Sequence, residues 1–223
     1  TGDVALKAEE LGSIEKGMGL AGIVSLVLVA VLLAVGLRSV RLIVATLVTL
    51  IVGLIWTAGF AMLTVGTLNL ISVAFAVLFI GLGVDFGIHF ALRYRETAVT
   101  NPARPALALA TAGVGPALTV TAIAAALGFY SFVPTDYLGL AELGVIAGSG
   151  MVIAWVASLT VLPALLAVMP FRRNPAPLGA GVGRKIAALP ERRPAVVVAL
   201  AAVLGLGSLA IAPQVRFDHN PLN

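Results

Sequence analysis

Apolar residues occur in six long runs along the 223-residue chain, separated by short polar or turn-forming segments. An α-helix needs roughly 20 mostly apolar residues to cross the hydrocarbon core of a bilayer. Arg38, Asn69, Pro102 and Asp136 are among the residues that interrupt the runs. The pattern therefore predicts membrane spans at about residues 17–36, 42–66, 70–92, 106–133, 138–168 and 195–212.

The composition supports a membrane protein built from helices. Hydrophobic residues make up 60% of the chain and charged residues 11%, whereas soluble domains contain about 25% charged residues. A β-barrel would instead show short segments of alternating polarity. The expected fold is an all-α integral membrane protein, a polytopic bundle of about six transmembrane helices.

The net charge of +4 reflects membrane orientation rather than nucleic-acid binding. The basic residues lie at the ends of the spans and form no patch with interleaved aromatic residues. If the loop after the first span is cytoplasmic, every Lys and Arg except Lys7, Lys16 and Arg216 falls on that side. Both ends of the chain are then expected outside, in the periplasm if the membrane is a bacterial inner membrane.

The segments outside the spans suggest a domain order. Residues 1–16 are polar and are interpreted as the tail of an external domain, and residues 214–223 as the start of another. Residues 17–169 form a five-helix core, and residues 170–193 a cytoplasmic linker. The centre of this linker, residues 178–189, is either a short interfacial helix or a solvated segment.

The third span contains two ionisable side chains. Asp85 is about 15 residues into the predicted span, or roughly 22 Å from its outer end at 1.5 Å per residue. His89 follows one helical turn later, on the same face. Because a charge in hydrocarbon costs several kcal/mol, such residues usually have a function. We expect Asp85 to bind and release protons and His89 to relay them, against the alternatives of a structural hydrogen bond and an interfacial histidine.

Several glycines are candidates for close helix packing. Gly81, Gly83 and Gly87 surround Asp85, and Gly144 and Gly148 lie in the fifth span. The G-x-x-x-G spacing lets helix backbones approach closely, although the motif is weak evidence alone.

Glu142, at the outer end of the fifth span, and the preceding Asp136 and Tyr137 are candidates for a proton or substrate pathway. Long polar side chains at such positions more often reach toward the interface.

The chain contains no recognisable enzyme motif. A second membrane aspartate is missing, so no protease dyad forms, and there is no P-loop for ATP. The absence of cysteine excludes disulfides and thiolate metal sites, and one Asp with one His supplies too few ligands for a metal. We expect a protein that is not an enzyme and has no cofactor.

Three sequence segments resemble the RND superfamily. Residues 68–96, with the core GLGVDFGIHF, look like its fourth transmembrane helix and are most similar to the MMPL-type lipid exporters, in particular their hopanoid-associated branch. The segment FVPTDY with Glu142, and the final residues FDHNPLN, look like the junction of the fifth and sixth helices and the start of the second external domain. The resemblance covers nearly the whole chain.

This resemblance implies twelve helices in two similar halves, a core like that of sterol-sensing domains, and a large periplasmic domain in each half. The chain would hold helices two to seven, with residues 194–213 as the first helix of the second half. Asp85 matches the proton-carrying acid of helix four, whose partner acid lies in helix ten. Many MMPL members have Tyr after this Asp, where this chain has Phe86.

The expected function is proton-driven export of hydrophobic, hopanoid-like lipids from the inner membrane toward the outer membrane. The partners would be the lipid, protons, membrane lipids, a periplasmic acceptor protein and other copies of the chain. The alternatives are an RND drug-efflux pump, a protein-translocation auxiliary, and a sterol-sensing module that does not transport. Neutralising Asp85 would be harmless only in the last of these.

Overall fold

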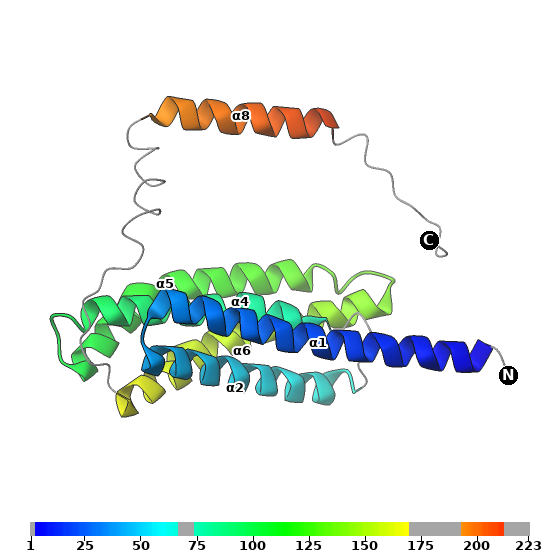
Figure 1. The fold of residues 1–223 in the computed structure, drawn as a ribbon, viewed down its shortest axis with the longest axis horizontal. Helices are drawn as coiled ribbons and strands as arrows, with labels where there is room; N and C mark the ends of the chain where they lie inside the picture. The colour runs from blue at the N-terminus through cyan, green and yellow to red at the C-terminus, as the bar shows by residue number, and fades with distance from the viewer. Residues whose placement is uncertain (1–2, 67–73, 170–192, 212–223) are drawn as a thin grey trace. The chain divides into compact units, whose positions relative to one another are not determined.

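The computed structural model describes residues 3–66, 74–169 and 193–211, and their side chains from Gly19 onward except at position 210. All regular elements in these ranges are α-helices (Figure 1). They are α1 (Asp3–Leu37), α2 (Val40–Thr64), α4 (Phe75–Thr97), α5 (Ala103–Tyr130), α6 (Leu138–Val168) and α8 (Pro194–Ile211).

The helices from α1 to α6 form one compact unit, in which α4 is the central element. Helix α4 packs against each of α1, α2, α5 and α6 (Figure 1). Helix α6 contacts α2, α4 and α5, while α1 lies against α4 and α2. A movement of α4 would therefore change its packing against all four neighbouring helices.

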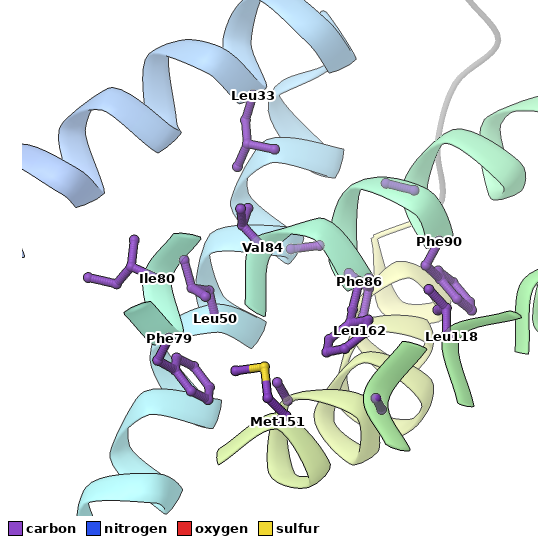
Figure 2. Close-up of a cluster of buried hydrophobic side chains, with 14 of the residues drawn as sticks. Leu33, Leu50, Phe79, Ile80, Val84, Phe86, Phe90, Leu118, Met151 and Leu162 are labelled. Carbon is purple, nitrogen blue, oxygen red and sulfur yellow. The ribbon is translucent and has the colours of Figure 1, made fainter. Parts of the chain in front are cut away.

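The buried side of α4 is aromatic. Phe79, Phe86 and Phe90 are at most 3% exposed and belong to a cluster of apolar side chains from five helices (Figure 2). Their spacing of seven and four residues places them along one side of the helix. Leu33 of α1, Leu50 of α2, Leu118 of α5 and Met151 of α6 join the same cluster.

Glycines allow the helices to approach one another closely at four of the predicted positions. A Cβ atom at Gly87 would lie 2.7 Å from Thr46 Cγ2, and one at Gly83 would lie 3.3 Å from Leu50 Cδ1, both in α2. A Cβ at Gly148 would meet the Tyr130 ring of α5 at 2.7 Å.

Gly144 is closely packed, whereas Gly81 is not. A Cβ at Gly144 would lie 2.7 Å from the carbonyl oxygen of Phe129, so this glycine is packed against backbone. Gly81 has no such neighbour within 4 Å. Within the described residues it lies on an open surface rather than in a helix contact.

The predicted spans agree with the helices to within a few residues, with two informative differences. The span predicted at 70–92 corresponds to α4, which continues to Thr97, while residues 67–73 lie outside the described ranges. The span predicted at 17–36 is the second part of α1, which already begins at Asp3. Among the described residues, five helices are long and apolar enough to cross a membrane.

Helix α8 belongs to a separate unit and is described by itself. It is an 18-residue apolar helix, and its apolar stretch, Pro194–Leu209, is shorter than the five candidate spans. The predicted interfacial helix at 178–189 lies outside the described residues.

The packing of Gly144 predicts a stability effect. Gly144→Ala would push a methyl group against the Phe129 carbonyl, and such overpacking costs about 1–3 kcal/mol. Gly128→Ala, in the adjoining helix, is the matched control because a Cβ there meets nothing within 4 Å. Thermal unfolding of the detergent-solubilised protein should show a lower midpoint for Gly144→Ala only. Equal midpoints for the two variants would contradict the packing.

Candidate functional site

One side of α4 is not covered by any described helix. Its exposed residues recur at intervals of three or four, so they lie along one helix face. We call this surface the open face of α4, and it consists of Leu78, Gly81, Leu82, Asp85 and His89. The exposed Arg93 follows at its C-terminal end, where its guanidinium lies against α5.

Asp85 and His89 lie on this open face near the middle of the apolar helix. Both side chains are exposed, and within the described ranges neither forms a hydrogen bond or an ion pair. The sequence placed them on one face, and the structure shows that this face points away from the aromatic core. A carboxylate and an imidazole are therefore available to a group outside the five-helix unit.

The residue after Asp85 lies on the other side of the helix. Phe86 is 3% exposed and is part of the apolar cluster shown in Figure 2. A tyrosine at this position would bring a hydroxyl group into that cluster, where it would need a hydrogen-bond partner. Phenylalanine suits this environment because it leaves no polar atom to satisfy.

The C-terminal end of α4 is fixed by two arginines. Arg93 Nη1 lies 3.0 Å from Glu96 Oε2, and the guanidinium of Arg93 covers Gly113 of α5. Arg95 Nη1 donates a hydrogen bond of 3.3 Å to the carbonyl oxygen of Leu37 at the end of α1. These contacts connect α4 to its neighbours one to two turns beyond His89.

The candidate pathway residues lie far from Asp85. Asp136 and Tyr137 are exposed in the turn before α6, and Glu142 is half-buried in the first turns of that helix. Gly150 of α6 packs against Phe79 of α4. Glu142 precedes this contact in α6, and Asp85 follows it in α4. Because the two helices run in the same direction, the two residues are separated by roughly 20 Å along the bundle, at 1.5 Å per residue.

The structure therefore brings together Asp85 and His89 but not the outer carboxylates. In the described part of the chain, no three His, Cys, Asp or Glu side chains gather in a way that would hold a metal ion.

An apolar crevice opens between α1, α2 and α4. Its volume is about 820 Å³, within the range of pockets for small molecules. Every lining residue is apolar or glycine: Gly19, Gly22, Ile23, Leu26, Leu50, Ile51, Leu54, Ala74, Ala76, Val77 and Ile80. The crevice lies beside the middle of α1 and the N-terminal part of α4, away from the arginines.

The sequence analysis did not identify this crevice. The signal for it was the group of small residues Gly19, Gly22, Ala74 and Ala76, which leaves space between two otherwise bulky helices. Small residues in membrane helices more often mark close packing. The arrangement of α1, α2 and α4 in the structure distinguishes an open crevice from close helix packing.

The chain is similar to known membrane transporters over its whole length. Residues 1–197 match the model of the MMPL family. The chain is 41% identical over 232 residues to the hopanoid transporter HpnN of Burkholderia multivorans, and 38% identical over 224 residues to HpnN of Rhodopseudomonas palustris. Both alignments cover 100% of this chain and 26% of the relative. The chain thus spans about a quarter of these relatives and is a multi-pass membrane protein of the MMPL family.

Proposed function

We propose that this chain forms the first-half membrane core of a transporter that exports hopanoid-like lipids, driven by the proton gradient through Asp85. The observation that carries the proposal is the exposed Asp85 on the open face of α4. Two relatives that the chain matches over its whole length are named hopanoid transporters, and the chain corresponds to about a quarter of their length.

We expect another segment of protein to contact the open face of α4. A carboxylate facing hydrocarbon costs several kcal/mol, so in membrane proteins it faces another helix or a water-filled cavity. Leu78 and Leu82 supply apolar contact area beside Asp85 and His89. A helix from the remainder of the full-length protein, carrying its own polar side chain, would satisfy both the apolar and the ionisable residues.

Proton binding at Asp85 would change this contact. The ionised carboxylate attracts a cation and accepts hydrogen bonds, whereas the neutral acid loses the attraction to a cation and gains an O–H donor. His89, one turn along, is placed to pass protons between Asp85 and the arginine-bearing end of α4. Because α4 packs against all four neighbouring helices, a shift of α4 would move the whole unit.

The apolar crevice suits a lipid substrate. It contains no charged side chain and is lined by the hydrocarbon surfaces of three helices. A rigid polycyclic or isoprenoid lipid could enter such a crevice without crossing a polar barrier. With the arginines on the cytoplasmic side, the crevice lies in the outer half of a bacterial inner membrane, and both chain ends are periplasmic.

Neutralising Asp85 tests the energy coupling. In the full-length protein, Asp85→Asn keeps the size of the side chain but removes the exchangeable proton, so we expect lipid export to fall at least tenfold at equal expression. Export is measured as the lipid transferred to the outer membrane in cells that lack the native transporter. Glu96→Gln is the control and should export normally, since Glu96 lies at the exposed end of α4 and exposed ion pairs such as the one with Arg93 contribute little to stability. Normal export by Asp85→Asn would refute the role of Asp85.

Filling the crevice tests the lipid site. Ile23→Trp places a large ring in the crevice, whereas Leu28→Trp adds the same ring to an equally exposed position of α1 that does not line it. We expect Ile23→Trp to lower export several-fold and Leu28→Trp to leave it unchanged. Equal export by the two variants would mean that the lipid does not use this crevice.

A further inference from the structure

A small cavity at the junction of α2, α4 and α6 has three hydroxyl-bearing residues among those that line it. Thr46 and Thr49 of α2 and Ser158 of α6 contribute its polar side chains, and all three residues are at most 4% exposed. Gly83 and Gly87 form part of its wall on the α4 side. The cavity wall is therefore mostly apolar, but it includes three residues that carry hydroxyl groups.

One of these hydroxyl groups has no partner. Thr46 Oγ1 is fully buried and makes no hydrogen bond. Other buried threonines of α2 behave differently: Thr49 and Thr57 donate hydrogen bonds of 2.8 Å to the carbonyl oxygens of Ala45 and Gly53. A buried hydroxyl without a partner is unfavourable. Thr46 is one of the residues that line the cavity.

The size and chemistry of the cavity fit one water molecule. The space open to the centre of a water-sized sphere is about 10 Å³, close to the minimum that holds a single water. Water needs two to four polar partners. Thr46 can donate to it, while Thr49 and Ser158 retain acceptor lone pairs. No acidic residue lines the cavity, so nothing there would compensate a metal cation.

The glycines of α4 keep this space open. A Cβ at Gly87 would come within 2.7 Å of Thr46 Cγ2, so a side chain there would displace Thr46 into the cavity. Gly83 and Gly87 flank Asp85 in sequence but lie on the buried side, whereas Asp85 is exposed. The cavity thus lies directly behind the helical turn that carries Asp85.

From these observations we infer that the cavity between Thr46, Thr49 and Ser158 binds one structural water molecule, which satisfies Thr46 and fills the space behind Asp85. The inference does not depend on the transported substrate or on proton coupling. It adds a bound ligand to the α2–α4–α6 junction.

A density map tests the site directly. A high-resolution structure of the full-length protein should show a water within about 2.7–3.2 Å of Thr46 Oγ1, the ordinary hydrogen-bond range. A well-resolved map with an empty cavity would overturn the inference.

Stability provides a second test, whose sign separates a wet cavity from a dry one. If the water is bound, Thr46→Val removes one of its partners and lowers the unfolding midpoint. Thr46→Ser keeps the hydroxyl group, so the density of the water should remain in the map. If the cavity is dry, Thr46→Val removes an unsatisfied polar atom and raises the midpoint. Thr57→Val is the matched control, since Thr57 is equally buried in α2, is bonded within the helix and does not line the cavity. A higher midpoint for Thr46→Val relative to this control would contradict the bound water.

Discussion

The cost of a carboxylate in an apolar environment constrains the rest of this structure. Asp85 lies near the middle of a helix that is long and apolar enough to cross a membrane, and the five-helix unit leaves it uncovered. Because an ionisable group cannot face lipid cheaply, the open face of α4 must meet protein or water. The five-helix unit is therefore arranged to present Asp85 and His89 outward rather than to bury them in its own core.

The two sides of α4 differ in their residues and in their contacts. The buried side carries aromatic rings and two glycines, which bring α4 against α2 at Thr46 and Leu50. The open side carries the ionisable groups, and the arginines fix the end of the helix to α1 and α5. In the mechanism that we propose, a change in charge on one side of α4 is transmitted through closely packed small residues on the other side, toward the apolar crevice.

The sequence predicted much of the fold because the hydrophobic runs are long and clearly separated. Helix α6 begins at Leu138 and ends at Val168, as the apolar run indicated. The prediction ended the third span at residue 92, before Arg93, whereas α4 continues to Thr97. In this last part Arg93 pairs with Glu96, and Arg95 donates to the Leu37 carbonyl. The sequence did not reveal which side of α4 is covered, since Leu82 and Phe86 are equally apolar but only Phe86 is buried. The crevice and the unpaired Thr46 depend on how three helices pack together. A pattern within one sequence segment does not predict such packing.

The central claim is that lipid movement is coupled to protons through Asp85. The most direct measurement is proton flux into liposomes that contain the purified full-length protein under an imposed pH gradient, followed with an internal pH-sensitive dye, with and without a hopanoid in the bilayer. The account predicts a hopanoid-dependent flux for the wild type and only background flux for Asp85→Asn. The same hopanoid-dependent flux in both proteins would contradict it.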